Sequence, residues 1–434
     1  MSFSESEKYL LSLGNEVEAM KLGLENITTL LSELGDPNTK YIKVQVAGTN
    51  GKGSVCAFLN SICLEAGIKT GLYTSPHLIS ITERIKINGE DISESEFARL
   101  ATIVRETSES LLSNGKLSHT PTYFEQVTAI GLLAFANAGV ELAILETGLG
   151  GRYDAVTAAK AEIAAITRID LDHQEYLGDT IEEIAAEKAA IIREDSHVVI
   201  GRQWERALDV ILEQCRRVEA TVSSELYDPW TVMPTGDGTV RIETTRVMYP
   251  SVVLGLRGRH QIENAETALN VVHALENETV FDLGFEVEES GAFAEGLEKA
   301  RHPGRLEYID NFLLDGAHNP GGAKALRQFL DETERRPVTL VFGAMRDKSV
   351  AEIAAVLWPR AERIILTRPS NSRAMTVDEL ALFTPNSIMA DKLTKTDDVA
   401  EAIEKARELT TQDGVILVTG SLYLVGEVKK LLNN

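Results

Sequence analysis

Hydrophobic positions in the first half of the chain follow two spacings in turn. Apolar and polar residues alternate from Tyr41 to Val46, as in a β-strand, and helical spacing follows from Val55 to Ala66. An earlier helix is expected over Met20–Leu34, ending before Gly35. The same patterns predict strands at Lys69–Tyr73, Leu142–Glu146, Ile163–Thr167 and His197–Ile200, and helices at Glu94–Leu112, Phe124–Ala138 and Ile181–Ile192. Strands that alternate with helices predict a mostly parallel sheet covered on both faces.

The pattern changes in the second half. Short alternating runs from Ser223 to Leu256 predict a small antiparallel meander, and helical spacing returns at Gln261–Leu275 and Ser290–Lys299. A second α/β rhythm then predicts strands at Leu306–Ile309, Phe312–Leu314, Val338–Phe342, Arg363–Thr367 and Val415–Thr419, and helices at Ala323–Leu330, Val350–Leu357, Val377–Leu382, Val399–Leu409 and Leu422–Leu432. We expect an α/β protein with a P-loop-containing, mostly parallel sheet in residues 1–297 and a smaller doubly wound, Rossmann-like domain in residues 298–434.

Composition narrows the class of protein. The 434 residues are 44% hydrophobic and 25% charged, which is typical of a globular protein with two or more cores. A net charge of -23 repels nucleic acid and anionic membranes. Cys56, Cys63 and Cys215 lack metal-ligand spacing and are expected to be buried, reduced thiols. The opening residues lack the basic region and apolar run of a secretory signal, so we expect a cytoplasmic protein.

A glycine-rich loop lies between the first predicted strand and the helix predicted over Val55–Ala66. It consists of Gly48, Thr49, Asn50, Gly51, Lys52, Gly53 and Ser54. Glycines let backbone amides approach phosphate oxygens, Lys52 adds a positive charge, and Ser54 offers a hydroxyl to a bound cation. The loop departs from the common GxxxxGK[ST] pattern, because two residues rather than four separate its outer glycines and Gly53 follows the lysine. The order of strand, loop and helix predicts a nucleotide-phosphate site.

Other polar residues occupy predicted strand ends. Glu146 ends one strand, and Asp172 and His173 follow the end of another. Ligands bind at the carboxyl edge of parallel sheets, and carboxylates suit Mg²⁺, so these residues are candidate metal ligands. Lys188 lies within an apolar helical run, where either its ammonium extends to water or the side chain serves a binding site. The sequence does not distinguish these alternatives.

Three further motifs flank the expected domain boundary. They are GRHQIENA (258–265), RHPGR (301–305) and DGAHNP (315–320), in which polar residues lie between apolar runs. Such positions are typical of ligand sites in α/β sheets. Arg305, Asp315 and His318 are therefore expected to reach ATP bound to the first domain.

With these motifs, the chain resembles the folylpolyglutamate synthase and dihydrofolate synthase family of the Mur ligase superfamily. The likeness runs from about Gly23 to Val425. It is carried by GTNGKGS, TSPHL (74–78), ERI (83–85), TYFE (122–125), ETGLGGRYDA (146–155), the DH at 172–173, EKAAI (187–191), GRHQIENA, RHPGR and DGAHNP. The resemblance implies a monomeric ATP- and Mg²⁺-dependent ligase that adds L-glutamate to dihydropteroate or to folate polyglutamates through an acyl phosphate.

The resemblance also implies roles for individual residues. Lys52 and the loop amides would hold phosphates, while the metal ligands would be Ser54, Ser75, Glu146, His173 and a carbamylated Lys188. Asn264, Arg305 and Asp315 would bind the nucleotide, and Asp315 with His318 would position glutamate. The pterin-binding residues would be Thr122, Tyr123, Phe124, Arg84 and Arg152.

The chain departs from the family pattern at two places, and other functions remain open. Ala190 replaces a glycine of the usual EKAGI, and Tyr153 and residues 155–157 differ from the usual GGRLDATN. The second change puts the fine substrate preference in question. One alternative is a Mur-type ligase acting on a peptidoglycan precursor, against which TSPHL, TYFE and DGAHNP favour the folate branch. Another is a P-loop ATPase switch, which would need no second α/β domain.

Overall fold

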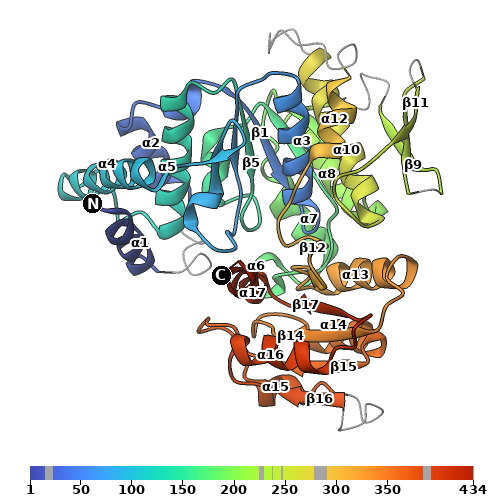
Figure 1. Ribbon diagram of the computed structural model, residues 1–434. Coiled ribbons are helices and arrows are strands. Elements are labelled where there is room, and N and C mark those ends of the chain that lie inside the picture. The colour runs from blue at the N-terminus through green and yellow to red at the C-terminus, as the bar shows by residue number, and fades with distance from the viewer. Residues whose placement is uncertain are drawn as a thin grey trace. The chain divides into compact units, whose positions relative to one another are not determined.

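The computed structural model describes residues 1–14, 23–223, 229–236, 238–245, 248–277, 291–384 and 392–433. The chain divides into two compact units (Figure 1). The first comprises Met1–Ile169, Thr180–Gly255 and Ile262–Ala300, and the second comprises Asp170–Asp179, Leu256–Gln261 and Arg301–Asn434. The short segments Asp170–Asp179 and Leu256–Gln261 thus belong to the second unit. A single boundary near Leu297 does not describe this division.

The first unit is built on an eight-stranded mixed sheet in the order β4-β3-β2-β5-β1-β6-β7-β8. Its strands are β1 (Ile42–Ala47), β2 (Thr70–Tyr73), β3 (Ile85–Ile87), β4 (Glu90–Asp91), β5 (Leu142–Glu146), β6 (Ile163–Ile166), β7 (His197–Ile200) and β8 (Thr221–Val222). Pairings from β2 to β8 are parallel, and β3 and β4 add an antiparallel edge. The expected mostly parallel sheet is confirmed. Its central strands β5, β1 and β6 lie side by side, so their carboxyl ends share one edge.

Helices complete this unit. They are α1 (Phe3–Ser12), α2 (Glu25–Glu33), α3 (Lys52–Glu65), α4 (Glu94–Ser113), α5 (Tyr123–Ala138), α7 (Ile181–Ala189), α8 (Glu205–Arg217), most of α10 (His260–Asn277) and α12 (Ala292–Lys299), with 3₁₀ turns η1 (Pro37–Thr39), η2 (Ile81–Arg84) and η3 (Ala155–Ala159). Ala143 and Leu145 of β5 belong to a core formed with α1, α2, α4 and α5. The helix α3 packs instead on β1, β2 and β5 and against α12.

Several helix boundaries differ from the sequence-based expectation. The helix α3 begins at Lys52 rather than Val55, because Gly51 adopts a left-handed conformation that starts the helix inside the glycine-rich loop. The helix α7 ends at Ala189, three residues early. Neither α1 nor α8 was predicted, although α8 buries Ala207, Ile211 and Cys215 at regular four-residue intervals. The beginning of the predicted Met20–Leu34 helix lies outside the described residues, and α2 starts at Glu25.

The predicted meander is a three-stranded antiparallel sheet. Its order is β11-β10-β9, with β9 (Thr231–Pro234), β10 (Val240–Glu243) and β11 (Met248–Val252). Trp230, Tyr249 and Phe293 form an aromatic cluster that attaches this sheet to α12. Residues 224–228, 237 and 246–247 of the predicted region and Ser290 lie outside the described residues.

The second unit contains a six-stranded mixed sheet in the order β12-β13-β17-β14-β15-β16. Its strands are β12 (Glu307–Ile309), β13 (Phe312–Leu314), β14 (Val338–Phe342), β15 (Arg363–Leu366), β16 (Leu393–Lys395) and β17 (Val415–Thr419). Its helices are α6 (Gln174–Leu177), α13 (Pro320–Glu332), α14 (Val350–Leu357), α15 (Val377–Ala381), α16 (Val399–Leu409) and α17 (Leu422–Leu432), with the 3₁₀ turn η4 (Trp358–Arg360). Only the β12–β13 pairing is antiparallel among the strand pairs described.

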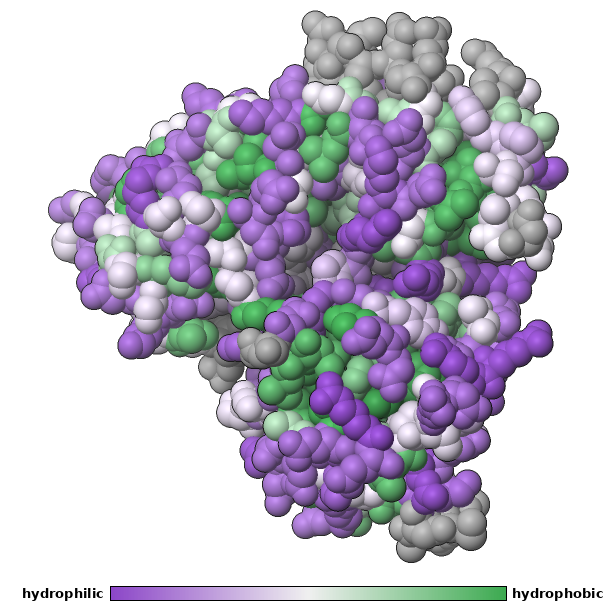
Figure 2. Space-filling view, viewed as in Figure 1, coloured by the Kyte–Doolittle hydropathy of each residue, from purple (hydrophilic) through white to green (hydrophobic). Residues whose placement is uncertain are grey.

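The surface and the cysteines agree with the composition. Hydrophilic residues cover most of the face seen in Figure 2, between smaller hydrophobic areas. Cys56, Cys63 and Cys215 are buried and form no disulfide, as predicted. Of the helices in the described part of the chain, none combines the length and apolar character that crossing a bilayer requires.

Candidate functional site

The glycine-rich loop joins β1 to α3 with close approaches that only glycine allows. A Cβ at Gly48 would lie 1.9 Å from Thr167 Oγ1, and one at Gly51 would lie 2.2 Å from Asn264 Oδ1. Gly51 has φ 96°, a conformation that other residues rarely adopt. The structure therefore brings Asn264, a buried residue of α10, against the predicted phosphate-binding loop.

Two backbone amides of this loop are already engaged. The amides of Thr49 and Asn50 donate to the carbonyl oxygen of Arg168, at 2.9 and 3.1 Å. Phosphate contacts would instead use the first turn of α3, where amides lack acceptors within the helix. Lys52 begins that turn, and its Nζ donates to the carbonyls of Gly48 (3.1 Å) and Thr49 (3.4 Å). The lysine thus lies over the loop that it is predicted to serve.

Glu146, at the carboxyl end of β5, contacts the predicted metal ligand Ser75. The Ser75 amide donates to Glu146 Oε2 at 3.1 Å, and Glu146 is 7% exposed. Ser75 Oγ is buried without a hydrogen-bond partner in the described structure. A carboxylate beside an unsatisfied hydroxyl is an oxygen set that suits Mg²⁺.

The loop that carries Ser75 is held by two charged residues that follow it. Glu83 accepts hydrogen bonds from the amides of Leu78, Ile79 and Ser80, at 2.8 to 2.9 Å. The buried Arg84 donates from Nε to His77 Nδ1 at 2.8 Å. Its guanidinium also lies 5.7 Å from the ring centre of Tyr123. The structure therefore brings together Arg84 and Tyr123, two of the residues predicted to bind substrate.

The other predicted pterin residues include one with a clear structural role. Thr122 caps α5, since its hydroxyl accepts from the Glu125 amide while Glu125 Oε2 accepts from the Thr122 amide. The Phe124 ring is partly buried and lies 6.4 Å from that of Tyr73. A Cβ at Gly148 would lie 2.6 Å from the Phe124 ring. Phe124 thus contacts the loop that begins directly after Glu146, at the end of β5.

Lys188 is buried in α7 with 4% of its surface exposed. This excludes the alternative in which its ammonium extends into water. The glycine-rich stretch after β5 packs on this part of the helix: a Cβ at Gly151 would lie 2.5 Å from the Glu187 carbonyl and 3.0 Å from that of Lys188. Arg152 in the same stretch donates from Nε to Glu187 at 2.8 Å. Arg152 is therefore tied to α7, and its predicted contact with substrate stays a prediction.

Asp154 is a candidate that the sequence analysis missed. It is 2% exposed and accepts from the amides of Leu149 (2.9 Å) and Val156 (3.0 Å). Burial raises the pKa of Asp154 to about 6, against the lowering effect of these hydrogen bonds. Its position within the GGRYDA motif is the feature of the sequence that could have identified it.

The second unit groups Asp172 and His173 with a lysine that was also missed. Lys348 Nζ donates to Asp172 Oδ1 at 2.8 Å and lies 3.0 Å from His173 Nε2. Asn319, the cap of α13, donates to Asp172 Oδ2 at 2.9 Å, and His318 Nε2 lies 3.7 Å away. Burial alone would raise the pKa of Asp172, but the contact with His318 and the charge of Lys348 hold it well below its usual range.

Asp315 supports the loop before α13. It accepts from the amides of Leu306 (3.0 Å) and Ala317 (2.9 Å), and burial raises its pKa despite these bonds and the Arg305 charge. His318 Nδ1 lies 2.8 Å from the Gly316 carbonyl, which sets the direction of its ring. The structure thus places Arg305, Asp315 and His318 in one part of the second unit.

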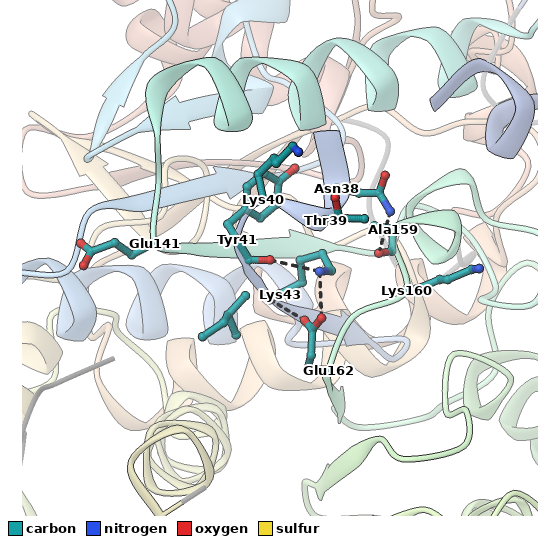
Figure 3. Close-up of a pocket in the computed structure, with 10 residues that line it drawn as sticks. Asn38, Thr39, Lys40, Tyr41, Lys43, Glu141, Ala159, Lys160 and Glu162 are labelled. Carbon is teal, nitrogen blue, oxygen red and sulfur yellow. Dashed lines mark hydrogen bonds and ion pairs between the residues drawn. The ribbon is translucent and has the colours of Figure 1, made fainter. Parts of the chain in front are cut away.

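A separate cavity of about 610 Å³ lies at the opposite, amino-terminal edge of the first sheet. Figure 3 shows Lys43 and Glu162, joined by an ion pair of 2.9 Å, together with Asn38, Lys40 and Lys160. Its ten lining residues include none of those predicted from sequence.

No ready-made metal cluster is present in the described part of the chain: no three His, Cys, Asp or Glu side chains gather closely enough to hold an ion. A magnesium site there needs hydroxyl, water or phosphate oxygens in addition to carboxylates, as Mg²⁺ sites in nucleotide-binding proteins commonly do.

Comparison with known proteins fits this architecture. Residues 46–272 match the Mur ligase middle domain, and residues 304–422 match the Mur ligase glutamate ligase domain. A dihydrofolate synthase/folylpolyglutamate synthase of Bacillus subtilis is 34% identical, over 95% of each chain. A Mycobacterium tuberculosis folylpolyglutamate synthase complexed with ADP is 30% identical with a TM-score of 0.88, covering 100% of this chain and 98% of that one.

Two further matches extend the comparison. A bifunctional folylpolyglutamate synthase/dihydrofolate synthase of Yersinia pestis, complexed with AMPPNP and Mn ion, is 28% identical with a TM-score of 0.83 over 100% of this chain and 98% of that one. A probable bifunctional folylpolyglutamate synthase/dihydropteroate synthase of Haloferax volcanii is 33% identical over 99% of this chain, which spans about half of that relative. The fold and loop define a Mur ligase. More narrowly, the chain belongs to the dihydrofolate synthase/folylpolyglutamate synthase family.

Proposed function

We propose that this protein is an ATP-dependent ligase that adds L-glutamate to dihydropteroate and to folate polyglutamates. The observation that carries the proposal is the glycine-rich loop with Lys52, set beside Asn264 and next to the Ser75–Glu146 pair. The full-length family matches supply the acceptor class. We further propose that the first unit binds ATP and the second serves glutamate ligation, and that the protein is a cytoplasmic monomer.

The reaction needs an activated carboxylate. The acceptor carboxylate attacks the γ-phosphate of ATP to give an acyl phosphate and ADP, and the α-amine of glutamate then displaces phosphate to form the amide. The attack brings two anions together, so positive charge must lie near the transferred phosphate. Lys52 Nζ and the amides of the first turn of α3 provide it from the protein.

The donor set in the first unit fits a divalent cation. Ser75 Oγ is a buried hydroxyl without a partner in the described structure, and Glu146 is a buried carboxylate beside it. These two groups, with Ser54, would hold Mg²⁺, which when bound offsets the charge of the phosphates. Carbamylation would convert Lys188 into an anionic metal ligand, and His173 is proposed as a metal ligand of the second unit.

The second unit supplies polar groups for the nucleotide and the amino acid. The charge of Arg305 acts to lower the pKa of Asp315, and His318 is oriented by the Gly316 carbonyl. We assign Arg305 and Asp315 to the nucleotide, and Asp315 with His318 to placing glutamate. Phe124, Tyr123, Arg84, Thr122 and Arg152 are assigned to the pterin.

The test is a ligation assay with all components separable. Purified protein receives ATP, Mg²⁺ and glutamate with dihydropteroate or tetrahydrofolate, and products are identified by mass. A ligase releases ADP only when acceptor and glutamate are both present, whereas a nucleotide switch releases it without them. Product formation that disappears in Lys52→Ala, with unchanged circular dichroism, supports the assignment; product formation that survives removes this loop from the mechanism.

A further inference from the structure

Hydrogen bonds attach the glycine-rich loop to the residues that follow β6. Arg168 O accepts from the amides of Thr49 and Asn50, and Thr167 Oγ1 donates to the carbonyls of Asn50 (2.9 Å) and Ala47 (3.3 Å). A Cβ at Gly48 would lie 1.9 Å from Thr167 Oγ1, so the loop approaches Thr167 too closely for a residue with a side chain. Residues 167 and 168 therefore help to fix the position of the loop.

A single carboxamide fixes those residues in turn. Gln203, in the loop between β7 and α8, donates from Nε2 to the carbonyls of Thr167 (2.8 Å) and Ile166 (3.3 Å). Its Oε1 accepts from the amide of Ile169 at 3.1 Å. Both ends of the side chain are used, and its three backbone partners bracket Arg168. A glutamine is suited to this place because it carries a donor and an acceptor on one planar group.

The neighbouring residue adds a second restraint. The Arg168 guanidinium lies 4.1 Å from the ring centre of Trp204, within the range of a cation–π contact. Trp204 is half exposed and precedes α8, so its ring is available as a platform at the surface. Gln203 thus holds the backbone on both sides of Arg168 while Trp204 contacts its side chain.

We propose that Gln203 is a positioning residue for nucleotide binding, acting through the carbonyl of Arg168 on the glycine-rich loop. The inference rests on the proposed function, in which that loop binds ATP. The hydrogen bonds of Gln203 go to residues 166, 167 and 169, none of which lies in the loop or is assigned to substrate. Its loss removes three hydrogen bonds from the backbone on both sides of Arg168, so the carbonyl that accepts from the Thr49 and Asn50 amides is held less firmly and the loop no longer presents α3 in a single geometry.

The experiment measures ADP affinity by calorimetry and steady-state kinetics in the full-length protein. Gln203→Ala is expected to weaken ADP binding and raise the KM for ATP by about tenfold, while kcat at saturating ATP and the KM for glutamate change less than about threefold. Gln203→Glu fills the same volume without the two N–H donors, and it should lose at least as much affinity. Full affinity in this variant would mean that Gln203 only fills space.

The matched control is Gln214→Ala. Gln214 lies on α8 and donates to the Ile192 carbonyl at 2.9 Å, so its removal costs a comparable hydrogen bond away from the loop. It is expected to leave ADP affinity unchanged. Thr167→Val removes the hydrogen bond from the Thr167 hydroxyl to the Asn50 carbonyl. The double variant with Gln203→Ala should lose less affinity than the product of the two single losses, because both residues act on the position of the same loop.

The outcomes separate this inference from the function on which it rests. Lys52→Ala must weaken ADP binding if the loop binds nucleotide; unchanged binding there overturns the proposed site and the role of Gln203 together. Weakened binding in Lys52→Ala with wild-type affinity in a folded Gln203→Ala overturns the positioning role alone. Should Gln203→Ala fail to fold, Gln203→Glu alone and in a double variant with Thr167→Val decides the matter by the same criteria.

Discussion

Lys348 Nζ lies 2.8 Å from Asp172 Oδ1, although 176 positions separate the two residues in the chain. The side chains are only 7% and 9% exposed. Asn319 satisfies the other carboxylate oxygen, and His173 contacts the same ammonium. This buried pair attaches the segment that carries His173 to the rest of the second unit.

We predict that Lys348→Met destabilises the protein strongly. Removing one partner leaves a buried carboxylate without its compensating charge, which typically costs about 3 kcal/mol or more. Urea unfolding followed by circular dichroism measures the effect. The control is Lys395→Met, which breaks a Lys–Asp pair of the same 2.8 Å length in the same unit, but with side chains 44% and 85% exposed. That change should cost less than about 1 kcal/mol; equal losses in the two variants would contradict the prediction.

The local parts of the fold could be predicted from sequence because their causes are local. Apolar alternation placed β1 and β5, and the glycines with Lys52 placed the loop between β1 and α3. The edge strands β3 and β4 were missed because three and two residues are too short for a periodic pattern. The helix α1 was missed although its Ser2–Glu5 capping box is visible in the sequence.

Among the candidate site residues, those in local motifs could likewise be predicted from sequence, and those with distant partners could not. Lys52, Glu146 and Asn264 stand in motifs that can be seen in one stretch of chain. The structure places Lys52 at the start of α3, Glu146 at the end of β5 and Asn264 beside Gly51, and their roles stay predictions. Lys348 and Gln203 act through partners that are distant in sequence, so nothing adjacent to them indicates their role. The occupied amides of Thr49 and Asn50 could not be foreseen either, because their acceptor, Arg168, is more than one hundred residues away.

Asp154 should make stability depend on pH in a defined window. Its pKa in the folded protein, about 6, lies above the ordinary value of 3.8, so the folded state binds the proton more tightly than the unfolded state does. Stability from this group is therefore present at low pH and is lost as the pH rises from about 4 through 6. Between pH 5.0 and 7.5, Asp154→Asn should gain about 1 kcal/mol relative to wild type.

Urea unfolding at those two pH values tests the Asp154 prediction. The exposed Asp209 of α8 provides the control variant Asp209→Asn in the same unit. Its stability relative to wild type should be the same at both pH values. A change of the opposite sign for Asp154→Asn, or none, would show that the folded protein does not disfavour the charged carboxylate.

Lys188→Ala should lose most ligase activity and regain part of it when short carboxylic acids are added. The ammonium of a residue only 4% exposed is poorly solvated, and carbamylation would turn it into an anionic group that an added carboxylate can imitate. Wild-type intact mass should show the addition of one carbon dioxide under non-acidic conditions. Lys116→Ala, at a side chain 56% exposed, should keep full activity and show no response to carboxylic acids. An unmodified, metal-free Lys188 in an active preparation would refute this role.

The protein should add glutamate to both dihydropteroate and reduced folate monoglutamate. Both reactions activate a carboxylate at the same ATP site, and the acceptors differ in how far the pterin lies from the reacting carboxylate. One catalytic centre with a tolerant pterin pocket therefore serves both. Phe124 offers aromatic surface next to the loop after β5, where the partly buried ring contacts Gly148.

Separate assays with each acceptor measure this range, and Phe124→Ala should raise the KM for both acceptors with little effect on the KM for ATP, because the ring would contact the pterin and not the nucleotide. Phe3→Ala is a matched loss of an aromatic ring in the same core, from a residue that packs on Phe97 and is assigned no substrate contact. It should lower stability without changing either acceptor KM. Tyr153, which is half exposed, and residues 155–157 depart from the family pattern. If the protein accepts fewer acceptors than expected, these residues are the candidates for the cause. Product from tetrahydrofolate alone would reduce the activity to folylpolyglutamate synthesis, and product from dihydropteroate alone would reduce it to dihydrofolate synthesis.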